Sequence, residues 1–250
     1  MTEVFFHPGL VLVLGAFLLP FLKGNARSAA ILGVPMLALF CLWRLPEGTL
    51  WSLHWLGYEL APLAVDKLSR LFATIFLLMA LGGGLFALGQ KSRLEIPAAF
   101  VYAGSAVGVT LAGDLVTVFL FWELMAVGST LVLWAGGTGG AFAASRRYVA
   151  IHLLGGVILF AGVAGHLLDT GDAAFTRMAP DSVAHWLILI GFLINAGAPP
   201  LSAWLPDAYP EASWSGSVFL SAFTTKTAVY VLLRGFPGTE FLIWIGIFMI

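Results

Sequence analysis

Charged side chains are scarce in this sequence. Only 10% of its 250 residues are Asp, Glu, Lys or Arg, while 60% are hydrophobic and the mean hydropathy is +0.97. Soluble domains carry about 25% charged residues. A soluble core of this length could not bury so much apolar surface. The composition therefore excludes a water-soluble globular protein and predicts a polytopic membrane protein.

Cysteine and clustered metal ligands are also lacking. The single cysteine, Cys41, cannot form an intrachain disulfide and lies in an apolar run, where it is expected to pack as a small residue. No Cys/His cluster has metal-site spacing, no Gly-rich phosphate loop follows a strand pattern, and no nucleophile–base pair is recognisable. A net charge of −1 argues against a nucleic-acid partner. We expect no cofactor, no metal and no bond-making chemistry.

The first apolar run, from Leu10 to Leu22, is not preceded by a basic segment. The residues before it, MTEVFFHPG, contain Glu3 and no Lys or Arg. Signal peptides have a positively charged segment at this place. We therefore expect a retained first helix.

Long apolar runs predict about nine membrane spans in an all-α helix bundle. Each run is too long for a strand, and lipid requires backbone groups to pair within one segment. The stretch 45–68 is expected to be an external loop with interfacial tryptophans. The predicted spans are 8–22, 28–44, 69–90, 96–113, 115–135, 142–168, 183–201 and 214–234, with another helix starting near 238.

Charge asymmetry between alternate loops predicts the orientation. Basic residues are concentrated in three of these loops, which are expected to face the cytoplasm because of the positive-inside rule. The N-terminus is then outside, in the plasma membrane of a prokaryote. The basic residues are Lys23, Arg27, Lys91, Arg93, Arg146 and Arg147.

A glutamate interrupts the apolar run from Leu115 to Trp134. Glu123 lies near the middle of this run, in the segment FLFWELMAVGS. A charge at this depth costs at least about 2.5–3.5 kcal/mol, so ionisable residues in membrane helices usually have a function. We expect Glu123 to take up and release a proton; the alternative is a neutral structural carboxyl.

A lysine lies in the middle of the eighth predicted span, SVFLSAFTTKTAVYVLLR. Hydroxyl groups near Lys226 could hold water for proton transfer, so we expect Lys226 to line the interior of the bundle. The alternative is that its ammonium group extends to the membrane surface. The hydroxyl residues expected to line the pathway are Ser221, Thr224 and Thr225.

Prolines interrupt the seventh predicted span. Pro199 and Pro200 follow Gly197, and proline removes a backbone donor and clashes with the preceding turn. A break near 196–200 is therefore expected. Broken membrane helices occur inside protein or along wet cavities and often bind ions in transporters. Asn195, just before the break, has either a pathway role or a capping role.

Histidine occurs twice in the sixth predicted span. His152 could relay protons, because a neutral imidazole both donates and accepts. A buried histidine can equally be structural, and His166 lies nearer the helix end. A metal site is not expected without a second ligand at close spacing.

Four stretches together resemble the antiporter-like proton-conducting subunits shared by respiratory complex I, membrane-bound hydrogenases and Mrp-type multisubunit sodium/proton antiporters, among them the D-type Mrp subunits. They are VDKLSRLF, FWELMAVGSTLVL, SRRYVAIHLLGGVILFAG and PLSAWLPDAYPEAS…SAFTTKTAVYVLLR. The resemblance covers nearly the whole chain, and the last two stretches are the most specific.

The resemblance implies two inverted five-helix repeats that form half-channels. Residues 1–95 would be an N-terminal three-helix segment, residues 96–234 the first repeat, and residues 235–250 the start of a further helix. The final run, FLIWIGIFMI, has no polar flank, so we expect the N-terminal part of a longer chain or a surface that packs on a partner.

The same resemblance assigns site residues. The family's fifth-helix glutamate corresponds to Glu123 and its eighth-helix lysine to Lys226. A lysine usual in the seventh helix is Asn195 here, and a frequent histidine after the proline is Ser202. Asn195 cannot form an ion pair with Glu123, which puts the family's usual pumping scheme in doubt for this chain.

Two functions follow from these observations. The first is a membrane subunit that translocates protons, sodium ions or both, with other membrane subunits as partners. The alternative is a scaffold subunit of the same type of complex that does not conduct, which the Asn195 substitution favours. A membrane-embedded enzyme has little support.

Overall fold

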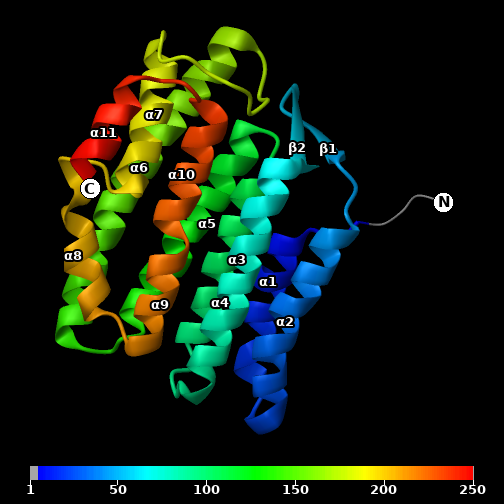
Figure 1. Cartoon of the computed structure of the whole chain (residues 1–250), viewed down its shortest axis with the longest axis vertical. Helices are drawn as coiled ribbons and strands as arrows, with labels where there is room; N and C mark the ends of the chain where they lie inside the picture. Colours follow the sequence, from blue (N-terminus) through cyan, green and yellow to red (C-terminus); the bar gives the residue numbers. More distant parts are fainter. Residues whose placement is uncertain (1–4, 250) are drawn as a thin grey trace.

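The structure is a computed structural model that describes residues 5–249, so Glu3 and Ile250 lie outside the described residues. The described chain is mostly helical, and its long helices run roughly side by side (Figure 1). The helices are α1 (Pro8–Leu18), α2 (Gly24–Arg44), α3 (Lys67–Phe86), α4 (Glu95–Leu111), α5 (Leu115–Trp134), α6 (Gly139–Thr170), α7 (Val183–Ala196), α8 (Trp204–Ala208), α9 (Trp214–Ala222), α10 (Thr224–Gly235) and α11 (Phe241–Met249).

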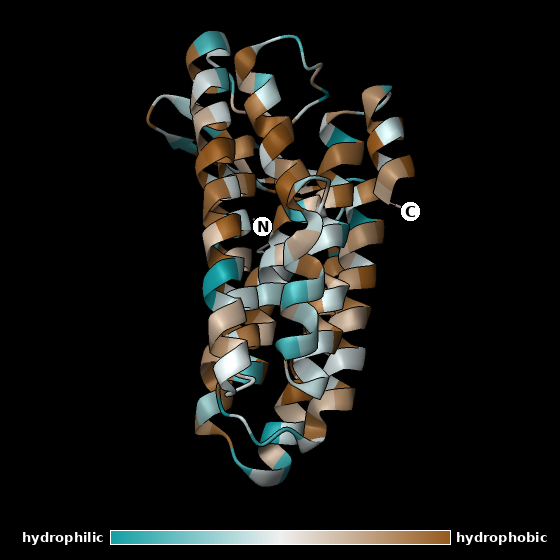
Figure 2. Ribbon diagram, turned by 90° about the vertical axis from the view of Figure 1, so that its left-hand side faces the viewer, coloured by the Kyte–Doolittle hydropathy of each residue, from teal (hydrophilic) through white to brown (hydrophobic). Residues whose placement is uncertain are grey.

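Six helical segments within residues 5–249 are long and apolar enough to cross a membrane. Two shorter apolar helical segments, Pro8–Phe21 and Glu95–Leu111, accompany them. Figure 2 shows apolar residues along much of the helices, with hydrophilic residues in the loops at the two ends and also at mid-height. The membrane class is therefore confirmed, while nine spans remain a prediction. The six segments are Gly24–Arg44, Lys67–Gly89, Leu115–Trp134, Gly139–Thr170, Val183–Glu211 and Trp214–Gly235.

Helix α4 lies at the centre of the bundle and is buried along almost its whole length. It packs against α1, α3 and α5. Its small residues allow this, because they let neighbouring backbones approach closely. A β-carbon at Gly104 would lie 2.5 Å from the carbonyl oxygen of Gly9 in α1. The close helix contact therefore depends on glycine at this position.

The stretch 45–68, expected to be an external loop, instead contains an antiparallel β-hairpin. Strand β1 (Gly48–Trp55) pairs with β2 (Tyr58–Val65). The two residues between them, Leu56 and Gly57, both have positive φ (50° and 87°), which suits a tight two-residue hairpin turn. The external position of this stretch stays a prediction. The hairpin packs on the bundle through β2, whose Leu60, Leu63 and Val65 are buried and which contacts α4 and α5.

Acidic caps fix the two helices that begin beside this hairpin. Asp114 caps α5 by accepting a 2.7 Å hydrogen bond from the Thr117 N–H, and it also accepts one of 2.9 Å from the Ala61 N–H of β2. Asp66 caps α3 by accepting a 2.7 Å hydrogen bond from the Ser69 N–H. Caps of this kind satisfy donors that the first helical turn leaves free.

The predicted break in the seventh span is present. Helix α7 ends at Ala196, and Gly197 follows with a φ of +77°. The N–H groups of Gly197 and Ala198 donate to the carbonyls of Ile194 (3.1 Å) and Leu193 (3.0 Å), which is the Schellman arrangement. Helical structure resumes only at Leu201 and continues into α8.

A second interruption divides the eighth span, which the sequence predicts to be continuous. Helix α9 ends at Ala222 and α10 begins at Thr224, with Phe223 between them at φ −116° and ψ −65°. The carbonyl oxygen of Leu220, near the end of α9, accepts hydrogen bonds from the hydroxyls of Tyr209 (2.9 Å) and Tyr102 (3.4 Å). Tyrosine hydroxyls thus satisfy the backbone at this break.

Candidate ion pathway between helices α5, α6 and α7

Glu123 projects from the middle of α5 towards α6. Its side chain is half-buried, and its buried Oε1 has no hydrogen-bond partner in the part of the chain that the structure describes. A β-carbon at Gly156 of α6 would lie only 2.1 Å from this oxygen. Glycine at 156 therefore creates the space that the carboxyl group fills.

Asn195 lies in the last turn of α7 and is fully buried. Neither its amide oxygen nor its amide nitrogen has a hydrogen-bond partner among residues 5–249. A β-carbon at Gly155 would lie 3.5 Å from its Oδ1. Glu123 and Asn195 thus face two consecutive glycines of α6. No hydrogen bond of the Asn195 side chain within the described chain supports the capping role that was considered for it.

His152 lies one turn before these glycines on α6 and is 1% exposed. Its Nδ1 is 2.9 Å from the carbonyl oxygen of Tyr148, so Nδ1 carries the proton and donates. Its buried Nε2 has no partner among the described side chains or backbone groups. In this tautomer, Nε2 is a free proton acceptor.

Two aromatic residues that were not predicted from the sequence enclose His152. The Tyr148 ring stacks on the imidazole at 3.9 Å between ring centroids, and the Trp204 ring meets it edge-on at 4.7 Å. Trp204 comes from α8, beyond the break, and its Nε1 donates to the Ile194 carbonyl (3.1 Å). Helical spacing could have identified Tyr148, because residues four apart in a helix are neighbours and Tyr148 is four residues before His152. Trp204 has no such signal, because the break alone brings it there.

Tyr148 extends the row of polar groups towards α9 and α10. Its ring is buried, and its hydroxyl forms no hydrogen bond with any described residue but lies near the hydroxyls of Ser129 and Thr224. Thr224 is itself buried, and its side chain is hydrogen-bonded to the hydroxyl of Tyr102. Of the predicted hydroxyl residues, Thr224 is the one that reaches the interior.

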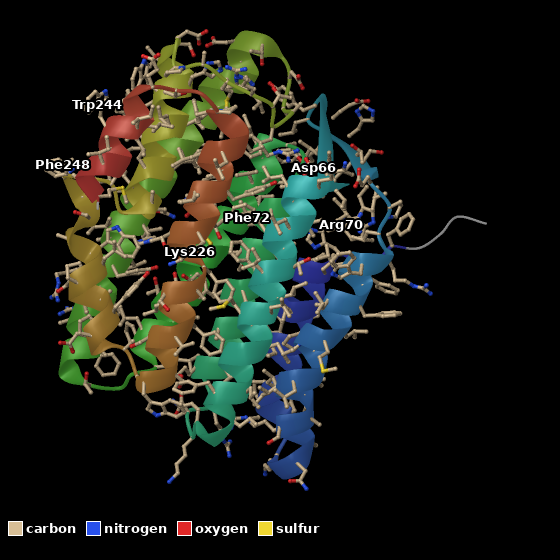
Figure 3. All side chains as sticks on the ribbon, in the orientation of Figure 1. Asp66, Arg70, Phe72, Lys226, Trp244 and Phe248 are labelled. Carbon is tan, nitrogen blue, oxygen red and sulfur yellow. The ribbon has the colours of Figure 1, made fainter. Side chains whose placement is uncertain are left out.

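Lys226 does not line the interior of the described chain, contrary to the sequence-based expectation. It is exposed, and its Nζ donates a 2.7 Å hydrogen bond to the Ser221 carbonyl at the end of α9. Figure 3 shows Lys226 on α10 at about mid-height of the bundle. The break before α10 supplies the physical reason, since the ammonium group satisfies a carbonyl there. The side chain borders a mainly apolar cavity of about 370 Å³, between α7, α10 and α11.

The remaining predicted pathway residues are not part of the interior cluster. Thr225 is half-buried and borders the same cavity as Lys226. Ser221 is exposed, and its hydroxyl donates to the Val218 carbonyl (2.9 Å). Ser202 is half-buried in the short turn Leu201–Ala203 after the break. The structure thus separates an inner cluster, formed by Glu123, Asn195, His152 and Tyr148, from an outer group around Lys226.

Metal ligands are not clustered in residues 5–249, where no group of three or more His, Cys, Asp or Glu could hold a metal ion. His166 is far from the inner cluster along α6. Its Nδ1 lies 3.1 Å from Nε2 of His185, whose Nδ1 in turn contacts Asp181 at 2.8 Å. This pair lies near the ends of α6 and α7, outside the inner cluster.

The inner cluster therefore combines a half-buried carboxyl with a buried imidazole, carboxamide and phenol, and none of the four is fully hydrogen-bonded within the described chain. Nearly all buried polar groups in folded proteins find a partner in protein or ordered water. Groups that exchange protons and bind water are what a proton path requires. The cluster fits ion or proton movement better than bond-making catalysis.

Comparisons with known proteins give a consistent result. A family described as "NADH:quinone oxidoreductase/Mrp antiporter, TM" matches residues 112–250. The chain is 24% identical over 248 residues to the D-type subunit of a Na(+)/H(+) antiporter from Alkalihalophilus pseudofirmus, covering 90% of this chain and 50% of that protein. It is 30% identical over 219 residues to the M-type subunit of NADH-quinone oxidoreductase from Pseudomonas aeruginosa, covering 77% and 42%.

A solved structure has the same fold. It is an archaeal membrane-bound sulfane sulfur reductase, a respiratory membrane complex, one chain of which superimposes with a TM-score of 0.81 at 20% identity. The superposition covers 95% of this chain and 56% of that one. The chain thus spans about half the length of the relatives that it matches.

Proposed function

The chain belongs to the NADH:quinone oxidoreductase/Mrp antiporter transmembrane family, and we propose that it is an ion-translocating membrane subunit of a multisubunit complex. The ions are protons, sodium ions or both, and the partners are other membrane subunits. In this proposal residues 1–95 form an N-terminal three-helix segment and residues 96–234 the first of two inverted five-helix repeats. Residues 235–250 begin a further helix.

The observation that carries this proposal is the environment of Glu123. Its carboxyl group lies in the middle of a membrane-spanning helix, fills the space left by Gly156, and has an Oε1 without a hydrogen-bond partner among residues 5–249. A structural carboxyl would be expected to have its hydrogen bonds satisfied. Glu95, which accepts from Gln90, Ser213 and Ser215, is an example in the same chain.

The inner cluster suggests the order of groups in the path. A proton leaving Glu123 would reach the free Nε2 of His152 through water near Asn195. From there, the Tyr148 hydroxyl and Thr224 lead towards the break between α9 and α10. Lys226 lies on the other side of α10, and in this proposal it receives the proton at the exit of the half-channel.

The orientation proposed from the charge pattern places the β-hairpin outside the cell and the loop between α3 and α4 in the cytoplasm. These two regions lie at opposite ends of α3. With Cys41 replaced, single cysteines at Glu59 and Lys91 would be exposed at these two places. In intact cells an impermeant thiol reagent should label the cysteine at 59 alone, and labelling at 91 alone would reverse the proposed orientation.

A scaffold protein that does not conduct is the second candidate. Two observations favour it: Asn195 cannot carry a charge, and Lys226 is exposed rather than inside the described bundle. The two candidates differ in what Glu123 does, because a scaffold needs the carboxyl only for packing. They therefore make opposite predictions for a substitution that keeps the shape of this side chain.

The test is ion transport by the complete complex in sealed vesicles, followed with a pH-sensitive dye. Glu123→Gln keeps the size and hydrogen-bonding capacity of the side chain but cannot take up a proton. Transport should fall at least about tenfold, since positioned proton-transfer groups contribute at least about 100-fold in enzymes. Glu59→Gln, on the exposed hairpin, is the matched control and should transport normally. Normal transport by assembled Glu123→Gln would support the scaffold function instead.

A further inference from the structure

A cavity at the end of the bundle opposite the hairpin is lined by basic side chains. It lies where α1 ends, α2 begins, and the loop between α3 and α4 passes, and its volume is about 190 Å³. Lys23, Arg27, Lys91 and Arg93 line it, and none of the described residues that line it is acidic. The start of α2 and the loop between α3 and α4 thus both contribute cations to one small space.

Hydrogen bonds hold these two segments together. The Arg27 guanidinium donates to the carbonyls of Gln90 (3.2 Å) and Ser92 (2.9 Å), which fixes the start of α2 against the loop between α3 and α4. These bonds leave the positive charge of Arg27 without a carboxylate partner among the residues that line the cavity. The arrangement is therefore held by the fold, although the side chains of Lys23, Lys91 and Arg93 are exposed.

No carboxylate is among the described residues that line the cavity. Glu95, the acidic residue at the start of α4, is fully buried and accepts hydrogen bonds from Gln90, Ser213 and Ser215. The N-terminus of α2 adds positive potential, since it has no acidic residue in its first turn and no side-chain cap. Four like charges this close repel one another, and an anion in the cavity would relieve the repulsion.

Apolar side chains also border the cavity. Leu19 and Leu22 line it, and Phe21 between them is 82% exposed. A phenylalanine so exposed at the end of an apolar helix offers a surface on which lipid acyl chains can pack. Charged side chains and an exposed apolar surface therefore adjoin each other at this end of the bundle.

We propose that this basic cavity binds the phosphate headgroup of an anionic phospholipid, whose acyl chains extend along the apolar surface around Phe21. The Lys and Arg side chains would hold the phosphate group of the lipid, and they could hold free inorganic phosphate in the same way. The adjoining apolar surface favours the lipid, and basic pockets between membrane helices are known to hold anionic headgroups. The site is remote from Glu123 and does not depend on the proposed ion transport.

The test is native mass spectrometry of the purified complex in detergent, titrated with phosphatidylglycerol or with phosphatidylcholine. One phosphatidylglycerol should be retained with higher affinity than phosphatidylcholine. Lys91→Gln and Arg93→Gln should each weaken its binding about fivefold, the effect expected for one basic residue near an anionic membrane surface. Arg146→Gln removes an exposed charge from α6, a helix that does not line the cavity, and should leave binding unchanged.

Lys23→Gln provides a third variant, at the start of α2, should either of the first two fail to assemble. Inorganic phosphate at the same concentrations should compete weakly, because it lacks acyl chains. Equal retention of the two lipids, or equal loss with Arg146→Gln, would overturn the proposal. Full competition by inorganic phosphate would also overturn it, because it would indicate a site for free anions. Crosslinking of Lys91 to a carboxylate of another protein in the complex would overturn it as well, because it would indicate a protein contact.

Discussion

The carboxyl group of Glu123 in α5 rests directly on Gly156 in α6, where a β-carbon would lie 2.1 Å from Oε1. Gly156→Ala should therefore push the carboxyl out of its place. We expect transport to fall at least about tenfold while the complex still assembles, because a flexible side chain can move and alanine favours a helix by about 1 kcal/mol over glycine.

Gly165→Ala is the matched control for this substitution. It lies on the same helix, and its new β-carbon would meet Ala184 at 3.2 Å, away from Glu123. The measurement is the transport rate of each variant in sealed vesicles, and we expect only Gly156→Ala to be slow. Equal rates in the two variants would show that the position of the Glu123 carboxyl is unimportant.

Lys226→Gln tests the outer group. The substitution removes the charge but can keep a hydrogen bond to the Ser221 carbonyl. Because Lys226 is exposed, we expect a stability change of about 1 kcal/mol or less and a loss of coupled transport of at least about tenfold. Lys67→Gln, also exposed, serves as control. If complexes with Lys226→Gln transport normally, Lys226 serves only as a hydrogen-bond donor to the Ser221 carbonyl at the end of α9.

Asp66 makes the stability of the fold depend on pH. It joins α3 to α10 through a 2.6 Å hydrogen bond from Arg234 (Asp66 is labelled in Figure 3). Partial burial acts to raise the pKa of Asp66, but hydrogen bonds from Ser69 and Arg234 and the charge of Arg234 outweigh it and hold this pKa below its ordinary value of 3.8. A carboxyl with a lowered pKa stabilises the fold above its ordinary pKa, and the stabilisation is lost as the pH falls through the lowered value.

Asp66→Asn should therefore lower the melting temperature in detergent at pH 7, and the difference from wild type should shrink steadily below about pH 4. Asparagine can still cap α3, so the variant removes mainly the charge. Asp169→Asn, at an exposed position, should change little. A melting-temperature difference for Asp66→Asn that stays constant from pH 7 to the acid limit would contradict the role of the charge.

Much of this arrangement follows from local sequence. The charge deficit and the long apolar runs predict membrane helices, and Gly197 with Pro199 and Pro200 predicts the break after α7. Glu123 and His152 are predictable because polar groups in apolar runs are costly. Each of these signals lies within a few residues of the feature that it predicts.

The features that were missed depend on tertiary contacts. Trp204 reaches His152 only because the break folds α8 back onto α6. The interruption at Phe223 has no proline or glycine, and the Leu220 carbonyl beside it is satisfied by Tyr102 and Tyr209 from elsewhere in the chain. Lys226 was predicted to be inside because it lies near the middle of its span beside several hydroxyl groups, but the outward face of α10 is set by packing against α7 and α4.

The central claim is that Glu123 takes up and releases a proton. Infrared difference spectroscopy of the complex after a pH step measures this directly, because a carboxylic acid and a carboxylate absorb at different frequencies. Wild type should show a carboxyl band that is absent in Glu123→Gln and retained in Glu59→Gln. An unchanged difference spectrum in Glu123→Gln would show that Glu123 keeps its protonation state and would contradict the account.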